Sequence, residues 1–295
     1  MTSPGDRDVY RERLWHAADD LPLYLRDYGD PYAARTPMLC LSGLTRNAAD
    51  FDTVARRLAA GGRRVICPDY RGRGRSGRAA DWRTYAPPRL VADLLDLLAM
   101  LDLHRVAVIG TSLGGLLAMG LAVARPSVLA AVVLNDVGPD VHAKGLGRIA
   151  DFIRRDRPQP DWESAEAELR RRLPTLGLAD DDAWRRFTRG TYREGADGRL
   201  HFDWDVRLVR TLGGPVPDLW PLFGALARVP VLAVRGGVSD VLTAATLQRM
   251  GATRPDLRAL VVPGVGHAPS LDEPECRAAI DDLLRTADNK IDTEH

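Results

Sequence analysis

One serine of the chain stands in a pattern that is typical of a catalytic nucleophile. Residues 110–114 read G-T-S-L-G, after the apolar run 106–109 and before the small-residue segment 116–124. A serine on a sharp turn between a strand and a helix projects its hydroxyl from the sheet, and flanking glycines relieve the crowding there. The helix behind the turn favours developing negative charge at its N-terminus. The pattern therefore predicts that Ser112 is a nucleophile.

A histidine downstream is the candidate base for this serine. A serine hydroxyl is a weak nucleophile that needs a base, and the base needs an orienting acid. Of the six histidines, His267 lies in the glycine-rich loop 263–269, directly after the strand-like run 257–262. His201 lies in irregular sequence and His295 in a polar tail. We therefore expect His267 to be the general base.

Two aspartates compete for the role of the acid. Asp240 lies in the turn 236–240, which follows the buried-strand pattern 229–235. This places a carboxylate at the carboxyl end of a strand, where ligands meet open α/β sheets. Asp136 ends the earlier strand-like run 130–135 and is a real competitor. We predict Asp240 as the acid, with Asp136 as the alternative.

Strand-like and helical patterns alternate over most of the chain. The strand-like runs lie at residues 22–28, 37–42, 63–68, 105–110, 130–135, 230–235 and 257–262. The helical patterns lie at residues 50–61, 88–102, 113–125, 242–252 and 274–286. This alternation predicts an α/β fold with a mainly parallel sheet that helices cover on both faces.

The alternation breaks between residues 137 and 225. This stretch is richer in arginine and aspartate, and its helical patches lie near residues 145–155, 161–173 and 180–190. It falls between two sheet strands, on the side where the serine emerges. We therefore expect an α/β core formed by residues 1–136 and 226–295, with residues 137–225 as a helical cap over the active site.

Further sequence blocks match those of a known family. They are 38–44 (M-L-C-L-S-G-L), 69–76 (D-Y-R-G-R-G-R-S), 235–240 (R-G-G-V-S-D) and 266–267 (G-H). Together with the serine turn, they make the chain resemble the α/β-hydrolase fold superfamily over roughly residues 20 to 286. The resemblance is to its serine-nucleophile branch of esterases and lactonases with a helical cap.

The resemblance also implies an oxyanion hole. Its donors would be the backbone N–H groups of Leu44 and Leu113. Ser42 stands where histidine is common in the family, but the donor at Leu44 does not depend on that side chain. Dehalogenases and epoxide hydrolases of this fold use a carboxylate at the position of Ser112, so the serine argues against both reactions.

The combined expectation is a serine hydrolase that cleaves a small carboxylic ester or lactone through an acyl-enzyme, with no cofactor. Aromatic residues of the cap are candidates to line an apolar acyl pocket, although each of them is more often simply core packing within a cap: Phe152, Trp162, Trp184, Trp204 and Trp220. Two alternatives stay open. One is carbon–carbon bond hydrolysis or cofactor-free perhydrolysis on the same triad, and the other is a non-catalytic receptor for a small ligand.

Composition argues against several other classes. The chain has 41 basic and 40 acidic residues, so it has no overall basic field for a nucleic acid. The G-x-G-x-x-G pattern at 72–77 is not a dinucleotide site, because no helix opens directly from its glycines. We expect a structural loop there, with Arg71 in an internal ion pair. No apolar run approaches the roughly 18 residues that span a bilayer.

The remaining signals concern the compartment. Residues 1–6 lack the basic and apolar regions of a signal peptide. The cysteines Cys40, Cys67 and Cys276 form no motif, which suits small core residues in a reducing compartment. Metal-ligand clusters of the usual spacing are absent from the sequence. We therefore expect a cytoplasmic enzyme without a metal and without a membrane or nucleic-acid partner.

Overall fold

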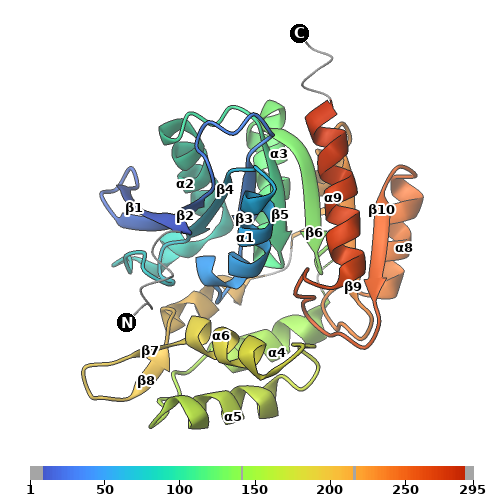
Figure 1. Cartoon of the computed structure of the whole chain (residues 1–295). Coiled ribbons are helices and arrows are strands. Elements are labelled where there is room, and N and C mark those ends of the chain that lie inside the picture. Colours follow the sequence, from blue (N-terminus) through green and yellow to red (C-terminus); the bar gives the residue numbers. More distant parts are fainter. Residues whose placement is uncertain (1–8, 141, 215–216, 290–295) are drawn as a thin grey trace.

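A computed structural model describes residues 9–140, 142–214 and 217–289, so the expectations for residues 1–6 and for His295 lie outside the described residues. Its centre is an eight-stranded sheet with the order β1-β2-β4-β3-β5-β6-β9-β10 (Figure 1). The strands are β1 (Tyr10–His16), β2 (Pro22–Tyr28), β3 (Met38–Leu41), β4 (Val65–Asp69), β5 (Val106–Thr111), β6 (Leu129–Asn135), β9 (Val231–Gly236) and β10 (Arg258–Val262). From β4 to β10 all pairs are parallel, while β2 runs antiparallel to both of its neighbours. The predicted α/β class with a mainly parallel sheet is confirmed.

The central strands are apolar up to their carboxyl ends because both of their faces are buried. Every residue of β3, β4 and β6 is buried, as expected of parallel strands that helices cover on both sides. The sequence did not reveal β1, which carries Arg and Glu on a mostly exposed edge strand. Charges at a sheet edge oppose pairing with other chains and also hide the apolar signal of a strand.

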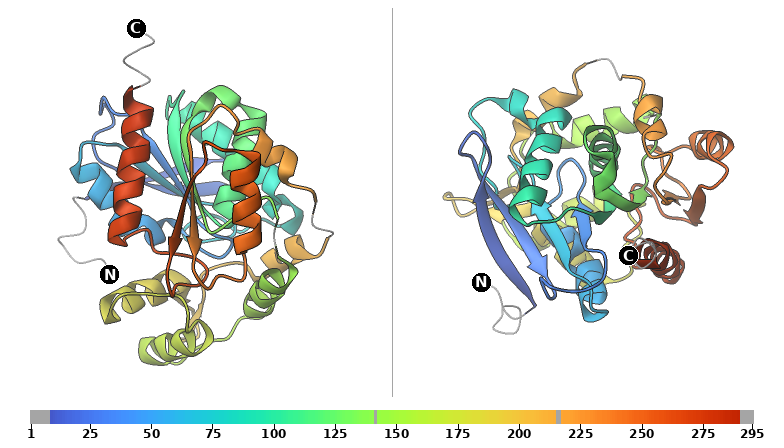
Figure 2. Two further views of the ribbon diagram at one scale, coloured as in Figure 1. Left: turned by 90° about the vertical axis from the view of Figure 1, so that its right-hand side faces the viewer. Right: turned by 90° about the horizontal axis from the view of Figure 1, so that it is seen from above.

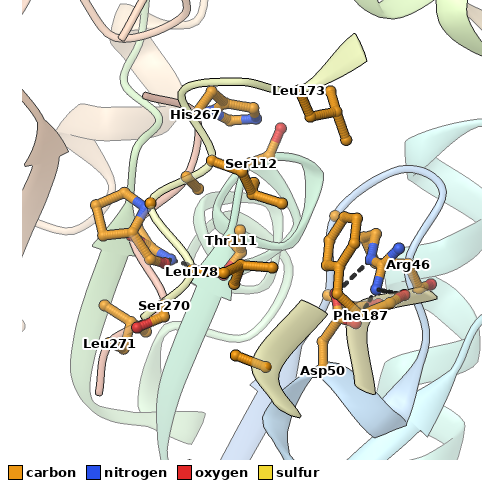
Figure 3. A pocket seen from close by; sticks show the side chains of 18 of the residues that line it. Arg46, Asp50, Thr111, Ser112, Leu173, Leu178, Phe187, His267, Ser270 and Leu271 are labelled. Carbon is orange, nitrogen blue, oxygen red and sulfur yellow. Dashed lines mark hydrogen bonds and ion pairs between the residues drawn. The ribbon is translucent and has the colours of Figure 1, made fainter. Parts of the chain in front are cut away.

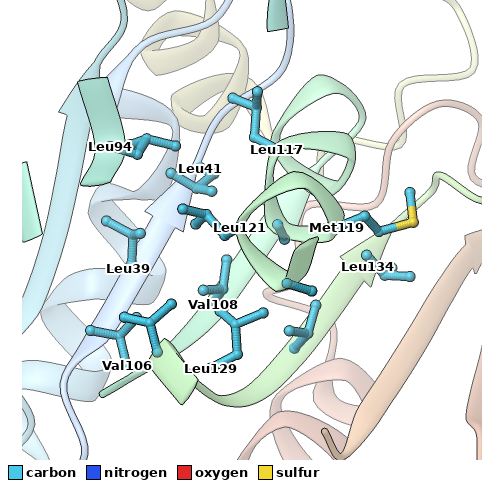
Figure 4. Packing of buried hydrophobic residues seen from close by; sticks show 14 of the residues in the cluster. Leu39, Leu41, Leu94, Val106, Val108, Leu117, Met119, Leu121, Leu129 and Leu134 are labelled. Carbon is cyan, nitrogen blue, oxygen red and sulfur yellow. The ribbon is translucent and has the colours of Figure 1, made fainter. Parts of the chain in front are cut away.

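Two layers of helices enclose the sheet (Figure 2). The helices of the core are α1 (Asp52–Ala60), α2 (Pro87–Met100), α3 (Leu113–Ala124), α8 (Ala244–Thr253) and α9 (Pro274–Asn289). Buried residues of α2, α3 and α8 belong to one apolar cluster, and those of α1 and α9 belong to a second cluster on the opposite face. Leu117 and Leu121 of α3 pack against Leu39, Leu41 and Val108 of the sheet (Figure 4).

The stretch between β6 and β9, residues 137–225, is called the β6–β9 segment here. It contains α4 (Ala143–Ile153), α5 (Trp162–Arg172), α6 (Asp181–Thr191), β7 (Tyr192–Glu194), β8 (Leu200–Phe202) and α7 (Trp220–Gly224). The helices α4 to α6 and the β7–β8 hairpin lie together beyond one end of the sheet (Figure 1), and most of them share a separate apolar cluster. The three expected helices are present, whereas the short hairpin was not anticipated. By contrast, α7 packs on the main core through Phe223.

Short 3-10 helices complete the chain: Ala48–Phe51, Trp82–Tyr85, Pro126–Val128 and Val206–Leu212. No helix within the described residues is long and apolar enough to cross a membrane. The three cysteines are free and buried, as expected of core residues. Arg71 is fully buried and forms ion pairs with Asp93 and Asp19, at 2.6 and 2.9 Å, so the predicted internal pairing of Arg71 is confirmed.

Candidate active site

Ser112 occupies the sharp turn between β5 and α3. Its φ of +53° lies in the left-handed region that side chains rarely adopt. The two flanking glycines make the turn possible, because Cβ atoms would clash there. A Cβ on Gly110 would lie 2.4 Å from the Gly114 oxygen, and one on Gly114 would lie 2.0 Å from the Leu41 oxygen. The motif is therefore a steric requirement of this turn, and it brings Ser112 to the wall of a cavity.

His267 lies in the loop between β10 and α9 and lines the same cavity. Figure 3 shows the Ser112 hydroxyl directed toward the imidazole ring. The Nδ1 atom of His267 is 2.6 Å from the Oδ2 atom of Asp136. Since a carboxylate oxygen accepts hydrogen bonds, Nδ1 carries the hydrogen and Nε2 is left for the serine. The alternative histidine, His201, is held elsewhere by Asp156 and Asp197.

Asp136 is the carboxylate that contacts His267. It is fully buried directly after β6. Its Oδ1 atom accepts the Gly236 N–H at 2.8 Å, and its Oδ2 atom accepts the Ser239 hydroxyl as well as the imidazole. Hydrogen bonds of this kind fix the direction of a buried carboxylate. The arrangement is suited to orient an imidazole.

Within the described residues, the predicted acid, Asp240, forms no hydrogen bond with His267, so the predicted Asp240–His267 pairing is corrected to Asp136–His267. Both carboxylate oxygens of Asp240 accept from Arg148 of α4, at 2.8 and 2.7 Å. These hydrogen bonds hold the pKa of Asp240 below its usual value. The reason lies in the sheet: β6 and β9 are neighbours, so the loops after both strands reach the same edge. The sequence places two carboxylates at this edge but does not show which one meets the imidazole.

The residues expected to form the oxyanion hole lie on either side of Ser112. Leu113 is the first residue of α3, where backbone N–H groups have no partner within the helix. Leu44 lies in the loop after β3. A Cβ added to the preceding Gly43 would lie 3.9 Å from the Ser112 Cβ. The geometry brings both leucines to the serine turn. Their function as oxyanion donors remains a prediction.

The cavity above Ser112 has a volume of about 530 Å³. Its floor includes Ser112 and His267, and its walls come both from core loops, within residues 42–53 and 268–274, and from the β6–β9 segment. The apolar wall residues are Leu44, Ile149, Phe152, Ile153, Leu173, Leu176, Leu178 and Phe187. Leu173, Leu178 and Phe187 surround the space opposite the serine in Figure 3. A small apolar group fits beside the serine, as in other small-molecule pockets.

Only one of the five aromatic residues expected to line this cavity does so. Phe152 is part of its wall, whereas Trp162, Trp184, Trp204 and Trp220 are not. Trp204 is buried and stacks on Phe202 at 4.2 Å between ring centroids. Trp220 packs on the main core, and its Nε1 donates to Asp140. The tryptophans stabilise the segment and its attachment, because large aromatic side chains dominate the packing of a small apolar cluster.

Two arginines of the cavity wall are already paired. Arg148 binds Asp240, as described above. Arg46 forms an ion pair with Asp50, donates to the Thr191 hydroxyl and lies 3.9 Å from the centroid of the Phe187 ring. The Arg148–Asp240 pair and the contacts of Arg46 with Thr191 and Phe187 link the core loops to the β6–β9 segment. Among the described residues, no group of three His, Cys, Asp or Glu side chains is arranged to hold a metal ion.

One polar residue near the nucleophile escaped the sequence reasoning. Asn135 is buried at the end of β6, and its Nδ2 donates to the Thr111 hydroxyl and to the Pro269 oxygen, at 3.1 and 2.9 Å. Its own backbone oxygen accepts the Ser112 N–H. Asn135 therefore ties the serine turn to the histidine loop. Two polar residues directly after a fully apolar strand, Asn135 and Asp136, were the available signal.

The chain is similar to known hydrolases over most of its length. A family model described as the alpha/beta hydrolase family matches residues 38–279. A 3-hydroxybutyrate-oligomer hydrolase from Cupriavidus necator is 36% identical over 84% of this chain and 87% of its own. A 2-(acetamidomethylene)succinate hydrolase from Mesorhizobium japonicum is 28% identical over 81% and 84%.

A crystal structure of an alpha/beta hydrolase from Novosphingobium aromaticivorans superposes with a TM-score of 0.87 at 44% identity. The match covers 94% of this chain and 98% of that one. The chain belongs to the alpha/beta hydrolase family.

Proposed function

We propose that this hydrolase cleaves a small carboxylic ester or lactone, with Ser112 as the nucleophile. One observation carries the proposal: Ser112 and His267 line an apolar cavity of about 530 Å³, and the buried carboxylate of Asp136 contacts the imidazole of His267 from behind. A hydroxyl, an imidazole and a buried carboxylate in this order form the group that activates serine in acyl transfer.

In the first half of the reaction, the Ser112 Oγ attacks the carbonyl carbon while the Nε2 of His267 takes the hydroxyl proton. Asp136 holds the imidazole in the required tautomer and stabilises the imidazolium. The backbone N–H groups of Leu44 and Leu113 receive the oxyanion. The bond to the alcohol oxygen then breaks, and His267 returns its proton to the leaving alcohol.

In the second half, water replaces the alcohol. His267 removes a proton from the water, which attacks the acyl carbon and regenerates the serine. In a lactone, the acid and alcohol parts stay joined in one product. Each oxyanion donor contributes about 3–4 kcal/mol to this type of reaction, so the two backbone amides matter on the same scale as the triad.

The walls of the cavity support a small substrate. Residues of α4, of α6 and of the stretch 173–180 complete the cavity over the serine, so the β6–β9 segment serves as a cap. The relative from C. necator is named for oligomers of 3-hydroxybutyrate. Such oligomers are joined by ester bonds between small acyl units, which suits an enclosed apolar site. The buried free cysteines support the further proposal that the enzyme works in the cytoplasm.

The decisive experiment combines covalent labelling with a substrate series. A fluorophosphonate probe should label the wild-type protein and not Ser112→Ala. Ser270→Ala is the matched control, because Ser270 lines the same cavity without contacting the triad, and it should label normally. Acetyl, butyryl and octanoyl esters of p-nitrophenol, γ-butyrolactone and a 3-hydroxybutyrate dimer then rank the substrates.

Two outcomes would contradict the proposal. Labelling of Ser112→Ala at the wild-type rate would place the nucleophile elsewhere. Tight binding of esters without any release of alcohol would favour a receptor. Rapid hydrolysis of emulsified long-chain triglyceride would contradict the enclosed cavity but not the nucleophile.

A further inference from the structure

Arg73 is a buried cation at the back of the loop that carries Leu44. It lies in the turn after β4 and is only 1% exposed. Two backbone hydrogen bonds join this turn to the β6–β9 segment. The Gly74 N–H donates to the Asp203 oxygen, and the Asp205 N–H donates to the Gly72 oxygen. The side chain is thus sealed between the core and the segment.

This guanidinium has no carboxylate partner in the described part of the chain, unlike Arg71 two residues earlier, which binds two aspartates. Instead, its Nε donates to the Leu44 oxygen and its Nη1 to the Arg71 oxygen. Its Nη2 is buried and has no hydrogen-bond partner among the described residues, although the guanidinium lies over the Tyr70 ring, 5.3 Å from its centroid. Burial lowers the pKa of Arg73 to about 10. An unpaired buried charge costs folding free energy, so a neutral side chain would suit a purely structural site better.

The contacts of Arg73 belong to a set that holds the loop after β3. The Tyr70 hydroxyl donates to the Ser42 oxygen at 3.2 Å, and the Arg46 N–H donates to the Gly43 oxygen at 3.1 Å. In a trans peptide the C=O and N–H groups point in opposite directions. The bond at the Gly43 oxygen therefore directs the Leu44 N–H to the other side, and the bond from Arg73 fixes the next peptide.

We propose that Arg73 is a positioning residue for the oxyanion hole. It holds the backbone at Leu44 in place in the loop near Ser112, and it sets a positive charge that has no salt-bridge partner among the described residues behind that loop. Preorganised donors and charges of this kind lower the barrier of acyl transfer because they need no rearrangement as the oxyanion forms. This inference rests on the proposed serine hydrolase function.

The test is Arg73→Met, which keeps an apolar stem and removes the donors and the charge. We expect kcat per active site to fall by about 10- to 100-fold, a part of the 10²- to 10³-fold loss seen when a donor is deleted. The KM should change by less than about threefold, since the ground-state carbonyl gains little from the donor. Affinity for a trifluoromethyl ketone inhibitor, which forms an oxyanion on Ser112, should fall by the same factor as kcat/KM. Arg73→Lys should recover part of the loss in kcat and part of the loss in ketone affinity. Lysine restores a charged donor, but it lacks the planar guanidinium that donates from several nitrogens.

The matched control is Arg254→Met. Arg254 is also a buried arginine that donates to two backbone oxygens, those of Leu226 and Val229. It differs in pairing with Asp256, and it lies at the opposite end of β9. The Arg254→Met variant should have a lower melting temperature and an unchanged kcat per labelled active site. Should Arg73→Met not fold, Arg73→Gln keeps a polar group in the site and removes the charge, and the same losses are expected.

Folded Arg73→Met or Arg73→Gln protein with wild-type kcat and wild-type ketone affinity would overturn the inference. A failure of the proposed function is separable from this result. In that case the wild-type protein itself would neither hydrolyse esters nor react with the fluorophosphonate.

Discussion

The loops after β6 and β9 each present an aspartate at the same edge of the sheet, and the two carboxylates differ in almost every contact. Asp136 is fully buried and accepts hydrogen bonds from Gly236, Ser239 and His267. The Asp240 side chain is 30% exposed and pairs with Arg148 of α4. The first contact set stays within the core, and the second joins the core to the β6–β9 segment. The contacts of Asp136 suit it to orient the imidazole, whereas those of Asp240 suit it to hold the β6–β9 segment in place.

The largest expected effect comes from exchanging each carboxylate for an amide. Asp136→Asn should lower kcat by about 10⁴-fold, because the amide favours the wrong tautomer of His267. The backbone of Asp136 has a φ of +53°, which asparagine also tolerates, so the variant should fold. Asp240→Asn should change kcat by less than about tenfold. Steady-state kinetics with one p-nitrophenyl ester checks both, and a reversed order would return the role of the acid to Asp240.

A second prediction compares the wall of the cavity with the interior of the segment. Phe152 lines the cavity, whereas Trp204 is buried behind it, with ring centroids 6.0 Å apart. Phe152→Ala should shift the ratio of kcat/KM for octanoyl and acetyl esters by about tenfold toward the longer chain, since one apolar contact is worth 1–3 kcal/mol in discrimination. Trp204→Ala should leave that ratio nearly unchanged. It should instead lower the free energy of unfolding by about 3–5 kcal/mol.

Chemical denaturation together with the ester series checks this prediction. If Trp204→Ala changed the chain-length preference more than Phe152→Ala, the wall of the acyl pocket would have been misassigned.

The smallest effect concerns the Arg148–Asp240 pair, whose side chains are 42% and 30% exposed. Solvent screens such a pair, so Asp240→Asn should lower the free energy of unfolding by only about 0.2–1 kcal/mol at neutral pH. Arg148 lowers the pKa of Asp240 below its ordinary value of 3.8. The stabilisation is therefore present above 3.8 and is lost as the pH falls through the lower folded-state pKa.

Urea titrations of both proteins from about pH 7 to about pH 3 should show the two curves converging on the acid side, and added salt should narrow the gap. A gap that widens on acidification would show that the pair is not the source of the difference.

The sequence by itself determined the elements that depend on local patterns. The apolar runs predicted all the parallel strands, since strands buried on both faces are mostly apolar and even the more exposed β10 carries the run Ala-Leu-Val-Val. The turn around Ser112 was predictable because its geometry leaves no room for a Cβ at positions 110 and 114, so glycine is required at both. The edge strand β1 and the hairpin β7–β8 were not, because short or charged strands lack a continuous apolar signal.

Tertiary structure decided which of two suitable carboxylates serves His267 and which aromatic side chains face the cavity. Asp136 and Asp240 both follow buried strands, and their sequence surroundings are equally suitable for an acid. Because β6 and β9 lie side by side, both carboxylates lie at the same edge of the sheet. The conformations of the two loops then direct Asp136 to the imidazole and Asp240 to Arg148. In the same way, packing within the β6–β9 segment turned Trp204 inward and left Phe152 at the cavity wall. Such choices depend on contacts between residues far apart in the chain, which local patterns do not encode.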